Sequence, residues 1–126
     1  MGRQASTLGR KTKNWHLVGN RYLLRPKADR DLDDQADYLA DVASPEVAHR
    51  FLLAAHETFA LLANQPRMGW RSKLRHPQLS QMRIFRVSRF ERILILYLPN
   101  AEGIEVLRVV HGSRNLQAIL SREGIE

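Results

Sequence analysis

An uninterrupted apolar run, Ile-Leu-Ile-Leu-Tyr-Leu, occupies residues 93–98 in the C-terminal part of the chain. A strand with one face in solvent alternates apolar and polar residues, whereas a strand covered on both faces is apolar throughout. The run is also far too short to span a bilayer. The sequence therefore predicts that residues 93–98 form the middle strand of a sheet covered on both sides.

Two further strands are predicted on either side of this run, at residues 82–87 and 104–110. The first alternates in character, and the polar residues 88–92 offer a turn between it and the central run. Residues 99–103 offer the second turn, in which Gly103 can adopt a positive φ at no steric cost. We therefore expect three consecutive antiparallel strands, followed by a basic loop that carries a histidine.

A pair of helices is predicted ahead of these strands. Residues 22–24 make a short first strand, after which the apolar positions take on helical spacing. Ser44 is a favoured N-cap residue and Pro45 a favoured first helical residue, so a second helix is expected to start there and to close at residues 64–66. The expected core stripes are Ala28, Leu32, Ala36, Leu39, Ala40 and Ala43, then Ala48, Phe51, Leu52, Ala55, Phe59 and Leu62.

The two segments that remain carry weaker signals. Residues 67–81 contain glycine, proline and much basic charge without periodicity, which is typical of a long loop, with a strand-like piece near Trp70. After the three strands, Ser113 or Asn115 can cap a short final helix that runs through Leu116, Ile119 and Leu120.

Together the elements predict an α+β fold of order β-α-α-β-β-β-(α), with a helical hairpin packed on one face of a mostly antiparallel sheet. Residues 1–19 show no sustained period and are expected to form a basic, flexible N-terminal extension. Residues 20–126 are expected to form a single domain, because 126 residues suffice for one core but not for two.

The amino-acid composition limits the cellular compartment and the kinds of site that the chain can form. The chain has no cysteine, so disulfides, thiolate metal sites and cysteine nucleophiles are excluded, and a reducing, cytoplasmic location is expected. The N-terminus is basic, but polar residues follow it instead of the apolar segment that a signal peptide needs.

The net charge of +7 is unevenly distributed along the chain. Residues 1–25 hold six basic and no acidic side chains, whereas residues 27–59 hold eight acidic and three basic ones. Residues 67–92 are again basic, with eight lysines and arginines against Glu91 alone. A basic sheet opposite an acidic helical face indicates a polyanionic or acidic partner on one side of the molecule.

Two groups of residues on the predicted helices contain side chains that can bind metals, but their spacing does not favour a metal site. The ladder Asp29, Asp33, Asp37 and Asp41 lies on a regular helix, whose carbonyls are used by its own hydrogen bonds, so a solvated face is expected. His49 and His56 are about 10 Å apart along a helix, too far for one zinc ion, so packing at the boundary of the core is expected.

A third group of candidate residues comes from two places, the loop after the last strand and the strand at residues 82–87. His111 and Arg114 could converge with Arg83 and Arg86, and such a group could cleave RNA without a metal by supplying a base, an acid and cations. Arginines on one face of a small sheet more often grip an acidic peptide or a phosphate backbone without chemistry. A plain nucleic-acid-binding module, with Trp70, Phe85 and Phe90 stacking on bases, is a further alternative.

Five pieces of the chain, in a fixed order, carry a resemblance to a known family. They read RYLLRPKADRDLDDQADYLAD, SPEVAHRFLLAAHETFALLANQPRMG, MRIFRV, ILILYL and GIEVLRVVHGSRNLQAIL. In this order they resemble the ParE/RelE superfamily of bacterial type II toxins, and they are most like the ParE branch. The resemblance runs from about Arg21 to about Leu120. It implies a toxin, in some systems associated with plasmid stabilization, that a cognate ParD-like antitoxin neutralises by wrapping it with a C-terminal segment.

The two branches of the superfamily imply different targets. A ParE toxin acts on DNA gyrase and is not a nuclease, whereas a RelE toxin cuts mRNA in the ribosome, commonly with a tyrosine near its C-terminus. The tail after His111 has no tyrosine, which favours ParE. We therefore expect no catalytic residue, or His111, Arg114 and Arg83 if the chain is RelE-like. The expected antitoxin- or target-binding residues are Arg83, Arg86, Arg89, His111 and Arg114, with no metal, no cofactor and no membrane partner.

Overall fold

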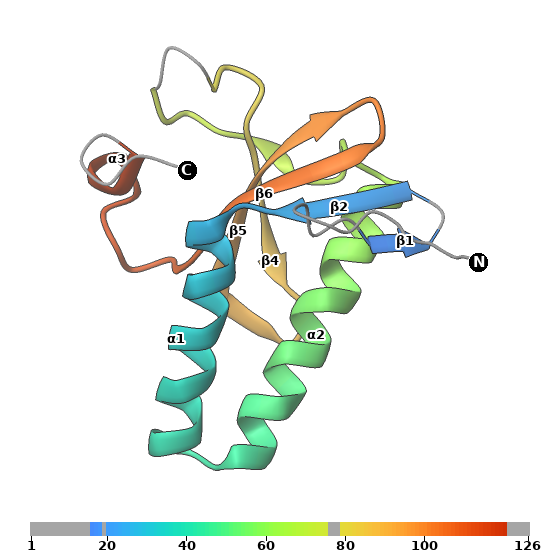
Figure 1. The fold of residues 1–126 in the computed structure, drawn as a ribbon. Coiled ribbons are helices and arrows are strands. Elements are labelled where there is room, and N and C mark those ends of the chain that lie inside the picture. The colour runs from blue at the N-terminus through green and yellow to red at the C-terminus, as the bar shows by residue number, and fades with distance from the viewer. Residues whose placement is uncertain (1–15, 19, 76–78, 121–126) are drawn as a thin grey trace.

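The computed structural model describes residues 16–18, 20–75 and 79–120. The strands are β1 (His16–Val18), β2 (Asn20–Leu24), β3 (Trp70–Arg71), β4 (Arg83–Val87), β5 (Phe90–Asn100) and β6 (Gly103–His111). The helices are α1 (Pro26–Val42), α2 (Pro45–Asn64) and α3 (Leu116–Ala118). The six strands form one sheet in the order β1-β2-β6-β5-β4-β3, and α1 and α2 form a hairpin on one side of it (Figure 1). The predicted α+β class is confirmed.

All neighbouring strands are antiparallel except β2 and β6, which are parallel. This parallel pair arises because the chain returns to the same edge only after the helical hairpin and the β4–β5–β6 meander. Gly103 opens β6 opposite Arg21 with φ of 146°. A side chain there would overlap the main chain of Arg21, so the close pairing requires glycine.

The meander is as predicted, but its turns are shorter than the sequence indicated. The predicted turns at residues 88–92 and 99–103 contract to Ser88–Arg89 and to residues 101–102, because β5 extends over both ends of the apolar run. Arg89 adopts φ of 67°, which lets two residues reverse the chain. The strand β1 falls in the segment for which the sequence predicted no regular element, and residues 1–15 lie outside the described part.

The central strand is covered on both faces, as the sequence predicts. Ile93, Ile95 and Tyr97 belong to the core cluster that includes the apolar stripes of α1 and α2. Leu96 lies in a second cluster on the other face, with Leu94 and Leu98 packed against it. The segment before β4 and residues 116–120 cover that second face, with Leu79, Met82, Ile119 and Leu120 buried there.

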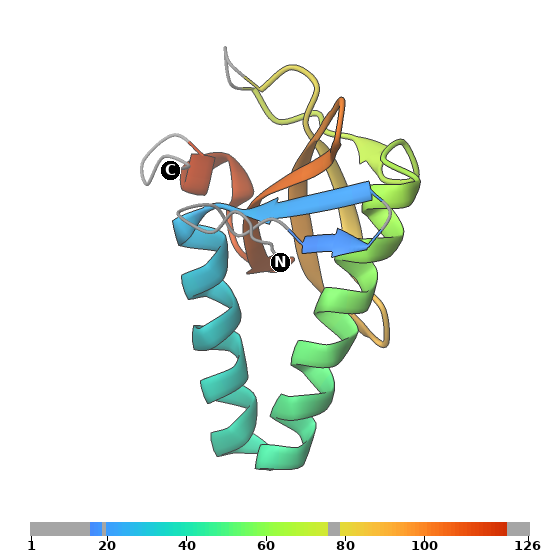
Figure 2. The same ribbon diagram turned by 45° about the vertical axis from the view of Figure 1, so that its right-hand side comes forward.

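The helix boundaries follow the capping signals closely. The Oγ of Ser44 accepts a hydrogen bond from the Val47 amide at 3.1 Å, as expected for an N-cap. The first helix begins at Pro26, two residues before Ala28, the first predicted core position, because a proline fits the first helical position. The helices lie side by side and are joined at the end of the hairpin farthest from β1 and β2 (Figure 2).

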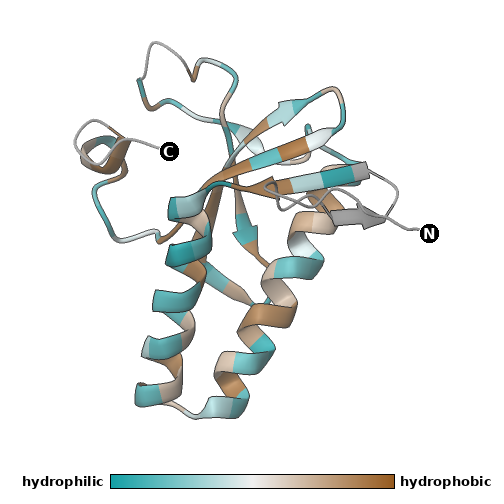
Figure 3. Cartoon of the chain, in the orientation of Figure 1, coloured by the Kyte–Doolittle hydropathy of each residue, from teal (hydrophilic) through white to brown (hydrophobic). Residues whose placement is uncertain are grey.

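The four aspartates of the predicted ladder, Asp29, Asp33, Asp37 and Asp41, are exposed, and α1 is mostly hydrophilic in Figure 3. A fifth aspartate, Asp31, has a structural task that the sequence did not reveal. Its carboxylate accepts two hydrogen bonds from Arg108, at 2.7 and 2.9 Å, and one from the Val109 amide at 2.9 Å. Asp31 therefore accepts the hydrogen bond of a β6 amide that lies beyond the end of β2, and it joins α1 to the sheet.

Replacing Leu96 by aspartate should abolish folding. Leu96 is fully buried, and an unpaired buried carboxylate costs several kcal/mol out of a total stability of about 5 to 15 kcal/mol. The matched control is Leu53→Asp, at a site on α2 that is 52% exposed, and it should leave the protein folded. Circular dichroism and urea denaturation distinguish the two, and a cooperatively folded Leu96→Asp variant would contradict the burial of β5 on both faces.

Removing the carboxylate of Asp31 should lower the free energy of unfolding by about 3 to 5 kcal/mol, because Arg108, which is 5% exposed, would lose the carboxylate that accepts two of its hydrogen bonds. The exposed neighbour Asp33 provides the control, since Asp33→Ala should change stability by less than about 0.5 kcal/mol. Urea denaturation measures both variants. Equal stabilities would show that the ion pair does not hold α1 to β6.

Candidate functional site

The corner between α2 and β3 is held by the side chain of Tyr97. Its hydroxyl donates to the Pro66 carbonyl at 2.7 Å and accepts from the Gly69 amide at 2.9 Å. Burial raises the pKa of the Tyr97 phenol, and the hydrogen bond from Gly69 and the charge of Arg83 lower it only in part. Tyr97 is thus a core residue, as the sequence predicts, and its hydroxyl is committed to the main chain.

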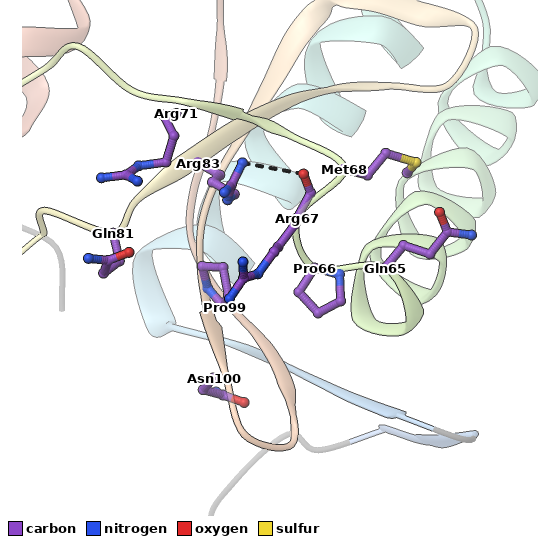
Figure 4. A pocket seen from close by; sticks show the side chains of 9 residues that line it. All are labelled: Gln65, Pro66, Arg67, Met68, Arg71, Gln81, Arg83, Pro99 and Asn100. Carbon is purple, nitrogen blue, oxygen red and sulfur yellow. Dashed lines mark hydrogen bonds between the residues drawn. The ribbon is translucent and has the colours of Figure 1, made fainter.

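Gly69 is required by the closeness of this contact. A Cβ at Gly69 would lie 2.5 Å from the Tyr97 hydroxyl and 2.7 Å from the Ile84 carbonyl, both closer than side chains tolerate. Arg83 also holds this segment, because its guanidinium donates to the Gly69 carbonyl at 2.6 Å and to the Arg67 carbonyl at 3.3 Å. Figure 4 shows the second of these hydrogen bonds. The exit from α2 is therefore fixed by hydrogen bonds from β4 and β5.

These contacts border an open pocket of about 820 Å³, which we call the basic pocket (Figure 4). Its lining consists of Gln65, Pro66, Arg67, Met68, Arg71, Gln81, Arg83, Pro99 and Asn100. The guanidinium of Arg71 donates to the Ser80 carbonyl at 3.0 Å. Three arginines and three amides supply hydrogen-bond donors, and no carboxylate is among the described residues that line the pocket.

A second pocket, of about 480 Å³, lies at the opposite end of the meander. Its lining includes Arg89, Arg92 and His111 together with Tyr38 of α1. The Nδ1 atom of His111 accepts from the Ser113 amide at 3.2 Å and lies 2.8 Å from the Ser113 hydroxyl. A backbone amide can only donate, so in neutral His111 the ring proton is on Nε2.

The predicted site residues are divided between places on the sheet. Arg83 pairs with Tyr97 across β4 and β5, whereas His111 pairs with Ile93, so the two lie four residues apart along β5, or about 13 Å. Arg86 stands 4.9 Å from the Trp70 ring.

Arg89 lines the pocket that contains His111, and the amide of Arg114 donates to the His111 carbonyl at 3.0 Å. The structure thus brings Arg89, His111 and Arg114 to one end of the meander and places Arg83 at the other. The two histidines of α2 lie apart from both pockets: His49 is exposed, and His56 lies 2.9 Å from the Tyr22 hydroxyl.

Sequence reasoning did not single out Arg67, Arg71 or Arg92 as site residues. A signal was present, because residues 58–90 contain seven lysines and arginines and no aspartate or glutamate. The residues of this stretch could not be assigned to a common pocket without the Tyr97 and Arg83 contacts, which join positions 14 to 31 residues apart in sequence.

Comparisons with known proteins agree with this architecture. A solved structure, titled the chromosomal ParDE TA system from P. aeruginosa, matches with a TM-score of 0.58 and 21% identity, over 70% of this chain and 90% of that one. At this identity the match supports the fold alone. A search of curated proteins found no match.

No helix in the described residues is long and apolar enough to cross a membrane. The family model described as the ParE toxin of the type II toxin-antitoxin system, parDE, matches residues 22–116, which include both pockets and every helix and strand between β2 and β6. The chain belongs to the ParE toxin family.

Proposed function

We propose that this protein is a cytoplasmic toxin that binds and poisons DNA gyrase and that a cognate ParD-like antitoxin neutralises. The observation that carries this proposal is the family match over residues 22–116. Two features of the described residues favour binding over RNA cleavage. Arg83 and His111 are about 13 Å apart along β5, and the hydroxyl of Tyr97 already makes two hydrogen bonds to main-chain groups.

The charge distribution supports an acidic or amphipathic antitoxin segment lying along the sheet, either as an added strand or as a helix in a groove. The residues proposed to bind the antitoxin or the target are Arg83, Arg86, Arg89, His111 and Arg114. They extend over both ends of the meander, and Arg83 and Arg86 pair with Tyr97 and Leu94, which pack on opposite faces of β5, so a segment on one face of the sheet contacts only some of them. The outer helical face is acidic and would repel such a segment.

Antitoxin binding is tested at Arg86 and Arg89, because the side chain of Arg83 holds the segment after α2 through two hydrogen bonds. The double variant Arg86→Glu/Arg89→Glu should slow association with the antitoxin about 10-fold at low salt and weaken its salt dependence, because charge steers encounter. The control Arg30→Glu/Arg50→Glu makes the same charge change at exposed positions on α1 and α2. Surface plasmon resonance at several salt concentrations measures both. Equal rates and salt slopes for the two variants would place the interface elsewhere.

His111 distinguishes gyrase poisoning from RNA cleavage. For a gyrase poison, His111→Ala should be mild, because a single neutral contact rarely exceeds about 1 kcal/mol outside a hot spot. For a nuclease with His111 as acid or base, the same change should lower cleavage about 10²- to 10⁴-fold with little loss of ribosome binding.

The two activities are measured with the same purified proteins. Wild type and His111→Ala are offered gyrase with supercoiled plasmid and ATP, and separately translating ribosomes. We expect both proteins to accumulate linear plasmid bound covalently to gyrase and neither to cut mRNA. Ribosome-dependent RNA cleavage by the wild type that His111→Ala abolishes would overturn the proposal in favour of an mRNA interferase.

A further inference from the structure

We propose that the basic pocket binds the phosphodiester backbone of DNA, so that the toxin contacts nucleic acid directly as well as gyrase. The assignment to DNA rests on the proposed action at gyrase. The contact itself requires only the geometry of the pocket. The lining contains many hydrogen-bond donors, because a guanidinium carries five N–H groups and a side-chain amide carries two.

Two of the three arginines of the pocket are held in position before a ligand arrives. Arg83 is fixed by the carbonyls of Gly69 and Arg67, and Arg71 by the carbonyl of Ser80. These hydrogen bonds engage one terminal nitrogen of each guanidinium, so other N–H groups of both side chains can reach an anion. Arginine suits phosphate because its planar fork can donate two parallel hydrogen bonds to two oxygens.

The surface around the pocket extends the basic charge beyond a single anion. Lys73 and Arg75 are exposed and alternate with the half-buried Ser72 and Leu74, so the segment after β3 turns cations outward at every second residue. The nearest acidic residues along the chain are Glu57 and Glu91, outside the acid-free stretch 58–90. A row of cations without intervening acids matches a polymer that carries one charge per nucleotide.

Trp70 lies on the opposite face of the edge strand β3 from Arg71 and Arg83, where it adds a contact for the bases of a nucleic-acid strand that passes over this edge. Trp70 precedes Arg71 in β3 and is 41% exposed, with the guanidinium of Arg86 4.9 Å from its ring centroid. Exposed aromatic rings among cations are the elements by which proteins hold single-stranded nucleic acid. An acidic peptide would also pair with the arginines, but it would have no bases to stack on Trp70.

The experiment measures oligonucleotide binding by the full chain without gyrase. Trp15→Phe leaves Trp70 as the single tryptophan, because the chain has two. Labelled 12-nucleotide single-stranded DNA, RNA of the same sequence and a 12-residue glutamate peptide are titrated by fluorescence anisotropy at several salt concentrations. Quenching of Trp70 fluorescence reports base stacking in the same samples.

The test variant is Arg67→Gln/Arg71→Gln, at two exposed positions, and the matched control is Arg30→Gln/Arg50→Gln. We expect the test variant to reduce DNA affinity about 10-fold at low salt and to reduce the slope of log K against log salt by about 1.5, near 0.7 per lost phosphate contact. The control should leave the slope unchanged, and DNA should quench Trp70.

Three results would overturn the proposal. Equal salt slopes for the two double variants would remove the basic pocket from the contact. Tighter binding of the glutamate peptide, with the same dependence on Arg67 and Arg71, would make the pocket a peptide site. Tighter binding of RNA than DNA would exclude the assignment to DNA. Gyrase is absent from all these samples, so failure here is distinct from a failure of gyrase poisoning in the plasmid assay.

Discussion

Burial of β5 on both faces is the constraint on which the rest of this structure depends. A six-residue apolar run can be stable in water only if one layer covers each side, and the chain supplies two different layers. The α1–α2 hairpin covers one face, and the segment before β4 covers the other together with residues 116–120. Both pockets lie at the margins of these layers, one at each end of the meander.

Tyr97 links this core to the surface. Its ring is packed under α2 while its hydroxyl holds both Pro66 and Gly69, so the exit from the helix is fixed by the same strand that forms the core. Arg83 completes the connection by using part of its guanidinium on that segment. Part of the lining of the basic pocket is therefore held in place, which lowers the entropy cost of holding an anion.

Local signals were enough to predict much of the fold. The apolar run, the Ser44 cap and the helical stripes act through neighbours in sequence, so pattern alone identifies the central strand, the hairpin and the short strand at Trp70. The parallel pairing of β2 and the bond between Asp31 and Arg108 depend on residues about 80 positions apart, which no local pattern records. The candidate site could not be predicted from local patterns for the same reason. Arginines that look alike in the sequence line different pockets, because they lie at different register positions in the sheet.

We propose above that the protein acts as a toxin by holding its target and not by cutting RNA, with cations presented at both ends of the sheet. The most direct test of this proposal is made in cells that express the protein without an antitoxin. Covalent gyrase–DNA complexes are recovered and quantified, and the integrity of total mRNA is followed over the same period. The proposal predicts that the covalent complexes rise while mRNA stays intact. Rapid mRNA cleavage with no rise in gyrase–DNA complexes would contradict it.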